Sequence, residues 1–259
     1  MRVASFNING VKARMPALTA WLDEARPDIA LLQEIKSADD AVPEEPFAER
    51  GYNLAVHGQK GFNGVAILSK LPIEDVVCSL PGDGDDTHAR WIEATVTGGR
   101  AVRVACLYAP NGNPAPGPKY DYKLAWMGRM QAHVTDMLGQ EMPLILAGDY
   151  NVIPQDSDAA SPEKWAEDAL ALPASRAALR RIRHLGLTDA VETRLPGSGH
   201  YTFWDYQGGA WRRGDGIRID HLLLSPQAAD LMTGAGIDTE TRGGDKPSDH
   251  APVWVEIEA

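Results

Sequence analysis

Six short segments of the sequence place carboxylate, amide, phenol or imidazole side chains at the start or the end of an apolar run. They are residues 6–9 (FNIN), 32–34 (LQE), 107–111 (LYAPN), 147–151 (AGDYN), 217–221 (IRIDH) and 248–250 (SDH). Each polar residue alone could simply cap a turn or satisfy a loop. Because binding and catalytic residues gather on loops that a rigid scaffold holds, the six segments together predict one shared cleft, rich in oxygen atoms and containing histidine.

The residue types of this cleft favour one kind of chemistry. Zinc sites use Cys and His, and the sequence contains neither CxxC nor HExxH. Asp, Glu and Asn oxygens instead suit Mg²⁺, for which Mn²⁺ can substitute. There is no P-loop, GxGxxG turn or GxSxG motif, so nucleotide-driven phosphoryl transfer and acyl transfer have no support. The pattern predicts metal-assisted hydrolysis of a phosphate ester by an activated water.

Alternating strand and helix patterns surround these segments. The predicted strands are residues 2–6, 28–32, 53–57, 65–69, 75–79, 90–96, 102–108, 143–147, 218–224 and 252–257, and the predicted helices are 15–25, 119–138 and 174–185. Both halves contain strands, a helix and then strands again, which predicts two packed sheets with helices outside. A length of 259 residues is typical of one α/β domain, here spanning 1–259.

The net charge of −11 argues against a partner that is bound by bulk electrostatics, because polyanions select basic surfaces. The charge is uneven, however. Residues 176–218 contain eight arginines and four acids, a net charge of +4, which leaves −15 for the remainder. This stretch could hold a polyanion, or its first part, 176–183, could be the solvated face of a helix.

The sequence also bears on location. No run of about 18 apolar residues occurs, and the N-terminal residues lack the features of a signal peptide. Cys78 and Cys106 lie in apolar runs, as buried free thiols of a reducing compartment do. We therefore expect a cytoplasmic protein that does not associate with a membrane.

Seven strings along the chain resemble the exonuclease III family of DNA repair nucleases, within the endonuclease/exonuclease/phosphatase superfamily. They are SFNING, LLQE, YNLAVHGQKGFNGVAILSK, LAGDYNV, FWDY, RIDHLLLS and KPSDHAPVW, in order from Ser5 to Trp254. FNxN, GDxN and SDH are shared across the superfamily, which includes phosphatases that act on lipids. HGQKGFNGVA and the R-I-D strand are more specific to the DNA repair branch.

This resemblance implies a fold and an activity. The fold would be a four-layer α/β/β/α sandwich, with helices outside two facing mixed β-sheets. The activity would be that of a divalent-metal-dependent nuclease that acts on double-stranded DNA. We expect Mg²⁺ as the metal and a monomeric protein. It would cut 5′ of abasic sites, trim 3′ ends as a 3′→5′ exonuclease and remove 3′ blocking groups.

The resemblance also implies roles for single residues. Glu34 with Asn7 would bind the metal, and Tyr108 would orient the phosphate. Asp149, supported by Asn151, would activate the water, while His250 would pair with Asp220. The implied catalytic set is Tyr108, Asp149, Asn151, Asp220 and His250. The implied metal-binding set is Asn7, Glu34, Asp149, Asn151, Asp249 and His250, with Asp249 at a second metal position.

Contacts to DNA would come from basic side chains and loop amides that follow the phosphate backbone. The predicted DNA-binding residues are Gln59, Lys60, Arg90, Asn111, Phe203, Trp204, Arg212 and Arg213. Alternation along YTFWDY would send one of Phe203 and Trp204 into the core and leave the other to wall a pocket for an extruded abasic sugar. Pro110-Asn111 matches the abasic-endonuclease branch, but the loop continues Gly-Asn-Pro, so the balance of exonuclease and endonuclease activity stays open.

Two alternatives to the DNA repair nuclease remain. One is a phosphatase or phosphodiesterase of the same superfamily that acts on inositol phosphates or another small phosphate ester. The other is a catalytically silent DNA-binding module, which is disfavoured because the full set of carboxylates, amides and histidine is intact.

Overall fold

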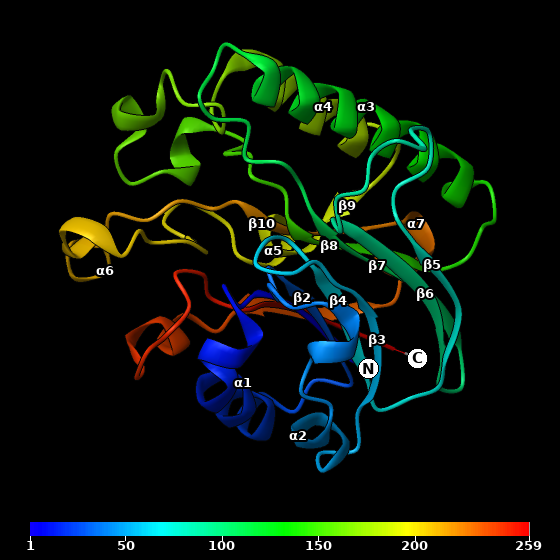
Figure 1. Cartoon of the computed structure of the whole chain (residues 1–259). Coiled ribbons are helices and arrows are strands. Elements are labelled where there is room, and N and C mark those ends of the chain that lie inside the picture. The colour runs from blue at the N-terminus through cyan, green and yellow to red at the C-terminus, as the bar shows by residue number, and fades with distance from the viewer. Residues whose placement is uncertain (259) are drawn as a thin grey trace.

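Two six-stranded sheets pack face to face in the computed structural model, which describes residues 1–258, and helices cover both outer faces (Figure 1). The first sheet has the order β11 (Met232–Ile237), β12 (Val253–Ile257), β1 (Arg2–Asn7), β2 (Ile29–Gln33), β4 (Val65–Ser69) and β3 (Asn53–His57). The second has the order β5 (Ile73–Cys78), β6 (Trp91–Thr97), β7 (Ala101–Tyr108), β8 (Leu144–Asp149), β10 (Asp220–Leu224) and β9 (Thr188–Asp189). The predicted four-layer sandwich is confirmed.

The outer helices bury apolar faces against the sheets. The α-helices are α1 (Val11–Ala25), α2 (Glu45–Ala48), α3 (Pro118–Leu138), α4 (Pro173–Arg183), α5 (Ala190–Arg194), α6 (Ala210–Arg213) and α7 (Pro226–Ala229). Helix α1 lies on the first sheet and α3 and α4 lie on the second (Figure 1). In α3 the buried residues Met127, Met130 and Val134 recur at helical spacing. No helix within residues 1–258 is long and apolar enough to cross a membrane.

Within residues 1–258, five short 3₁₀ helices lie in the connections. They are η1 (Asp39–Ala41), η2 (Asp156–Asp158), η3 (Pro162–Trp165), η4 (Gln207–Gly209) and η5 (Thr239–Gly243). Three of them, η2, η3 and η4, belong to the long connections between β8 and β10. The positions of residues in these connections cannot be predicted from hydrophobic periodicity.

The topology brings polar strand ends to one edge of the sandwich. Strands β1 and β2 run parallel, with Asn7 opposite Gln33, and strands β7 and β8 run parallel, with Tyr108 opposite Asp149. Parallel neighbours need a crossover connection, and α1 and α3 supply the two crossovers. Strand β10 is antiparallel to β8 and begins at Asp220, directly opposite Asp149. The ends of β1, β2, β7 and β8 and the start of β10 therefore carry the residues of one site.

Every predicted strand and helix is present, with ends shifted by a few residues, but two strands were not predicted. Strand β11 has the sequence MTGAGI, whose glycines have low strand propensity, and it forms because it pairs with β12.

The position of Cys78 differs from its prediction. It is exposed because β5 is an edge strand whose side chains are mostly exposed, whereas Cys106 is buried as predicted.

The arginines of residues 176–218 do not form one basic surface. Arg218 is buried, and its guanidinium lies 2.8 Å from carboxylate oxygens of both Asp158 and Asp189. Three other arginines of this stretch also pair with acids: Arg176 with Asp156, Arg183 with Glu192 and Arg213 with Asp215. Exposed Arg180 and Arg181 lie on α4, so this part of the chain is a solvated helix face. Four of the eight arginines of this stretch are thus paired with acids in the fold.

The Arg218–Asp189 pair yields a prediction about stability. Burial raises the pKa of Asp189, but the hydrogen bond from His221 and the charge of Arg218 outweigh burial and hold the pKa well below its usual range. Because a lowered pKa stabilises the fold above the unfolded value of about 4, that stability is lost as the pH falls. Asp189→Asn should lower the free energy of unfolding by about 3–5 kcal/mol at pH 7.

Urea unfolding of both proteins at pH 7 and at lower pH measures this effect. The difference between them should shrink as the pH falls below about 4. Asp156→Asn is the control, because Asp156 pairs with Arg176 at the surface and should change stability by less than about 1 kcal/mol. An Asp189→Asn protein as stable as the wild type at pH 7 would contradict the assignment.

Candidate active site

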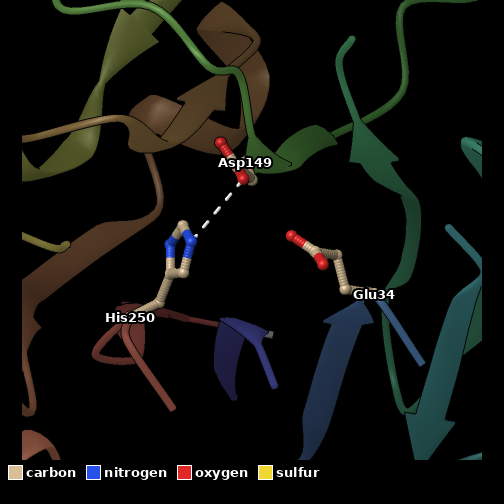
Figure 2. A group of neighbouring side chains, drawn as sticks. All are labelled: Glu34, Asp149 and His250. Atoms are coloured by element: carbon tan, nitrogen blue, oxygen red, sulfur yellow. Dashed lines mark ion pairs between the residues drawn. The ribbon is translucent and has the colours of Figure 1, made fainter. Parts of the chain in front are cut away.

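Six of the predicted residues meet at the strand ends. Asn7 ends β1, Glu34 follows β2, Tyr108 ends β7, Asp149 ends β8, Asp220 begins β10 and His250 lies just before β12. Figure 2 shows the side chains of Glu34, Asp149 and His250 pointing toward one another from different elements. One potential ligand atom from each of these three lies within 4.8 Å of the others.

The buried amide of Asn7 joins the carboxylates of the two sheets. Its Nδ2 donates to Glu34 Oε1 at 2.9 Å and to Asp149 Oδ2 at 3.0 Å. Lys36 Nζ lies 2.8 Å from the other oxygen of Glu34 and 2.5 Å from Asn9 Oδ1. Burial raises the pKa of Glu34, but Lys36 and Asn7 outweigh burial and lower it, so Glu34 is a carboxylate at neutral pH.

Glu34 also has an uncommon backbone conformation. Its φ is +51°, in the left-handed region that a residue with a long side chain seldom adopts. Asn9 and Asn151 have similar φ values, +48° and +50°. Strained backbone of this kind is kept where surrounding structure enforces it, and it clusters at functional sites.

Asp149 is buried, with only 2% of its surface exposed. Burial raises its pKa, and the charges of Asp220 and Glu34 raise it further, against the opposing charge of His250. The backbone N–H of Asn151 donates to Asp149 Oδ1 at 2.9 Å. Two acidic side chains that meet in a buried place repel each other unless a cation lies near them. The carboxylates of Glu34 and Asp149 supply oxygen ligands of the kind that hard divalent cations prefer, so this pair fits a Mg²⁺ or Mn²⁺ ion. The Asn7 amide nitrogen faces both carboxylates, and its oxygen accepts from Asn9 N at 3.2 Å.

His250 is held by Asp220. Its Nδ1 lies 2.8 Å from Asp220 Oδ2, and its Nε2 faces Asp149 Oδ2 at 3.8 Å. Burial lowers the pKa of His250, but the charge and hydrogen bond of Asp220 and then the charge of Asp149 outweigh it and raise the pKa. The ring is therefore an imidazolium at neutral pH, with Nε2–H directed at the centre of the site. The Ser248 hydroxyl donates to Asn7 O at 2.6 Å and so fastens this loop to β1.

Tyr108 is a neutral phenol beside these charges. Burial raises its pKa well above the ordinary value, and the charges of Glu34 and Asp149 act in the same direction. The guanidinium of Arg90 lies over the ring at 4.8 Å, and Arg90 Nη1 donates to Tyr108 O at 3.3 Å. Arg90 Nε is buried and has no hydrogen-bond partner among the described residues.

Other predicted residues have different surroundings. Asp249 is not one of the three clustered residues, and its Oδ1 accepts a hydrogen bond from Asn9 Nδ2 at 3.1 Å. The side-chain oxygen of Gln59 accepts from Asn63 Nδ2 at 2.8 Å and from the backbone N–H of Ala89 at 3.1 Å. Gln59 therefore holds the 58–64 turn in place, while Lys60 is exposed on it.

The structure separates the two aromatics of YTFWDY. Phe203 contacts His250, with ring centroids 4.9 Å apart. Trp204 is only 4% exposed and packs against Trp211 in a separate apolar cluster. This corrects the prediction of a DNA contact by Trp204, which is a core residue. Segment 201–205 makes only isolated bridges, so strand alternation could not decide between them.

Sequence reasoning missed several residues of the site. Lys36 and Asn9 form bonds that position Glu34, and the Thr202 hydroxyl accepts from the backbone N–H of Asp220 at 3.2 Å. Lys123 of α3 is the fourth, and its helical spacing from Met127 and Met130 places it on the apolar face. A lysine on that face was the available signal for a specific role.

Known proteins with a similar sequence or fold support this description. Residues 4–250 match the Endonuclease/Exonuclease/phosphatase family. The exodeoxyribonuclease III of Haemophilus influenzae is 34% identical, across 99% of this chain and 100% of the relative. The chain belongs to the exonuclease III group of this family. The predicted membership and the predicted hydrolytic nuclease chemistry are confirmed, and the family is divalent-metal-dependent.

Solved structures agree along the whole chain. A 3′–5′ exonuclease from Neisseria meningitidis superposes with a TM-score of 0.96 at 37% identity, covering 100% of both chains. A second structure of the Neisseria protein, described as a 3′ phosphatase bound to product DNA hairpin, has the same TM-score, identity and coverage. An AP endonuclease from Archaeoglobus fulgidus has a TM-score of 0.95 at 33% identity, also covering 100% of both chains.

The His250–Asp220 pair yields a prediction about catalysis. Asp220→Asn removes the charge that keeps the ring protonated and oriented, so kcat should fall by about 10²–10⁴-fold and the pH profile of kcat should change. Steady-state rates on an abasic duplex across pH measure both. Glu93→Gln is a matched control, because it breaks another carboxylate–imidazole pair, the one that Glu93 of β6 forms with His133 of α3. An unchanged pH profile in Asp220→Asn would disprove the pairing's role.

Proposed function

We propose that this protein is a Mg²⁺-dependent DNA repair phosphodiesterase acting on double-stranded DNA. It cuts 5′ of abasic sites, trims 3′ ends as a 3′→5′ exonuclease and removes 3′ phosphates and blocking groups. The observation that carries the proposal is the Asn7-bridged pair of carboxylates, Glu34 and Asp149, facing the imidazolium of His250. The activities named for its relatives support the substrate class.

Each residue performs a step that its surroundings permit. A divalent ion held mainly by Glu34 with Asn7 would neutralise charge on the phosphate. Asp149, whose pKa is raised, accepts the proton of the attacking water and is oriented by Asn7 and by the N–H of Asn151. His250 donates from Nε2 to a phosphate oxygen, while Asp220 keeps the ring charged and fixed.

Tyr108 and Arg90 act on the phosphate from the other side. The phenol of Tyr108 keeps its proton, because burial raises its pKa well above the ordinary value, so it donates a hydrogen bond and orients the phosphate. Arg90 lies over that ring and has an unused Nε–H. Together they hold the substrate in line for attack.

The DNA-facing surface is small. Lys60 is exposed, and Phe62 on the same turn is 71% exposed, an unusual position for a large apolar side chain. Further contacts are expected from the amides of 58–64 and from exposed Asn111 and Arg212. Arg213 and Arg218 belong to the basic stretch that the sequence suggested for DNA binding, but each is paired with an acid, so their positive charges are compensated within the protein. A short DNA footprint follows from this distribution, because DNA beyond it meets an acidic surface.

Three further expectations belong to this proposal. The chain acts as a monomer, it forms a single domain over residues 1–259, of which Ala259 lies outside the described residues, and it works in the cytoplasm. No observation favours the alternative of an inositol phosphate or small-ester phosphatase. The named activities of its relatives are directed at DNA or its 3′ ends.

Salt dependence of binding tests the DNA interface. The inactive Asp149→Asn protein is titrated with an abasic duplex in Ca²⁺ or Mg²⁺ at several salt concentrations. The logarithm of the binding constant should fall linearly with the logarithm of the salt concentration, with a slope of about −0.9 for each neutralised phosphate and only a few phosphates in all. Lys60→Ala should reduce that slope by about one, because it removes one phosphate contact. Lys70→Ala is the control, since Lys70 follows the opposite end of β4. If the affinity for the abasic duplex changed neither with salt nor in Lys60→Ala, the result would favour a small phosphate ester as the substrate.

Discrimination between nucleotides tests the separated aromatics. Phe203→Ala should relax the preference for an abasic over an intact nucleotide, because Phe203 borders His250. Trp204→Ala should keep that preference and instead lower stability by about 3–5 kcal/mol, as for a core aromatic. Ratios of kcat/KM on abasic and intact duplexes, with unfolding curves, measure both. Retained discrimination in Phe203→Ala would assign Phe203 to packing alone.

A further inference from the structure

Lys123 is a fully buried lysine that has no role in the proposed hydrolysis mechanism. It lies in the second turn of α3 and is 0% exposed. Its Nζ donates to three backbone carbonyl oxygens, those of Asn111 at 2.9 Å, Asn151 at 2.5 Å and Ala169 at 3.3 Å. An ammonium group has three donors, and all three are used here.

Keeping a lysine at this place is unfavourable by itself. Burial lowers the pKa of Lys123 to about 7, although the charges of Asp149 and Asp168 oppose the change. None of its three hydrogen-bond partners is a carboxylate, so no direct ion pair offsets the loss of water. The neighbouring Met127 and Met130 on the same face show that an apolar residue would suit the packing of α3. The ammonium therefore serves the carbonyls that it binds.

The three carbonyls belong to segments that are far apart in the sequence, and two of these segments follow strands that end at the site. Asn111 follows β7, Asn151 follows β8 and Ala169 lies in the connection before α4. The Asn151 backbone has φ +50° and donates its N–H to Asp149 Oδ1. Lys123 thus fixes the carbonyl of the residue whose N–H orients Asp149.

The Asn111 segment packs directly on the lysine stem. Gly112 has φ +93°, and a Cβ atom there would lie 2.7 Å from Lys123 Cδ and 3.2 Å from Ala169 Cβ. Asn113 Nδ2 donates to Asp168 Oδ1 at 3.0 Å, and Asn113 Oδ1 accepts from Ala169 N at 3.1 Å. The loop that carries Asn111 is therefore docked on the segment that Lys123 also binds.

We propose that Lys123 is a positioning residue for phosphodiester hydrolysis, which holds Asn151, and through it Asp149, in register with the Asn111 loop. This inference rests on the proposed function for the identity of the reaction. Its distinguishing consequence is that loss of the ammonium misplaces Asp149 while the core of α3 remains packed. A displacement of about 1 Å at a catalytic group lowers the rate by about 10²-fold.

The test compares Lys123→Met with a matched control, Arg103→Met. Methionine keeps the apolar stem and removes the ammonium. Arg103 is another buried cation, paired with Glu93 at 2.7 Å and located on β7 away from the strand ends. Both variants are assayed on an abasic duplex, with unfolding curves for each. Lys123→Met should lower kcat by about 10²-fold and change KM by less than about threefold, while Arg103→Met should lower stability and leave kcat near the wild-type value.

A double-mutant cycle separates positioning from general destabilisation. If Lys123 acts through Asn151, Lys123→Met should have an effect of less than about threefold in an Asn151→Ala background. Independent, multiplying effects of the two substitutions would overturn the proposal, as would a fall in kcat no larger than that of Arg103→Met. If Lys123→Met does not fold, the same cycle is run with Lys123→Gln, which keeps a neutral donor.

Hydrogen exchange supplies a readout that is independent of activity. The N–H of Asn151 is protected by Asp149 Oδ1, so its exchange should become at least about tenfold faster in Lys123→Met and stay unchanged in Arg103→Met. Unchanged exchange at Asn151 would overturn the inference even if the enzyme is fully active. If the wild-type protein were inactive on abasic DNA while the two variants still showed this difference in exchange, the result would count against the proposed function alone.

Discussion

The Asn7 amide donates to one carboxylate from each of the two sheets, and the rest of the site is arranged around that bridge. Glu34 and Asp149 belong to separate sheets and would repel each other at this distance without compensation. The compensation comes from positive groups placed around them, Lys36 on Glu34 and His250 beside Asp149. A divalent ion of the kind on which the family depends would add to it. The sandwich therefore brings two acids together that neither sheet would hold alone.

Topology and electrostatics support each other in this arrangement. Two parallel crossovers place the ends of β1, β2, β7 and β8 at one edge, so the acids need no long loops to meet. Lys36 follows the same strand as Glu34, whereas His250 comes from the loop before β12 and Lys123 comes from α3 in an outer layer. The buried Arg218–Asp189 pair uses the same kind of charge pairing, and its predicted effect is on stability.

The predictable part of the fold and site is the part that local pattern determines. Apolar runs ending in Asn, Glu or Asp predicted the converging strand ends, because a strand delivers its terminal residue to the sheet edge wherever the sheet lies. Local sequence patterns could not predict contacts between residues that are distant in the sequence. Nothing near Arg218 indicates that Asp158 and Asp189 enclose it. The exposure of Cys78 depends on β5 being an edge strand, and the burial of Trp204 depends on packing against Trp211, and neither is a property of the local residues.

Mg²⁺ affinity, measured by titration calorimetry, tests the carboxylate bridge most directly. The structure clusters Glu34 with Asp149 and leaves Asp249 bound to Asn9 instead. Glu34→Gln should therefore weaken Mg²⁺ binding by at least about tenfold, a loss of about 1.4 kcal/mol, while the overall fold is retained. Asp249→Asn should keep the affinity within about threefold of the wild type. Equal Mg²⁺ affinity in the wild type and Glu34→Gln, or a larger loss in Asp249→Asn, would contradict this account.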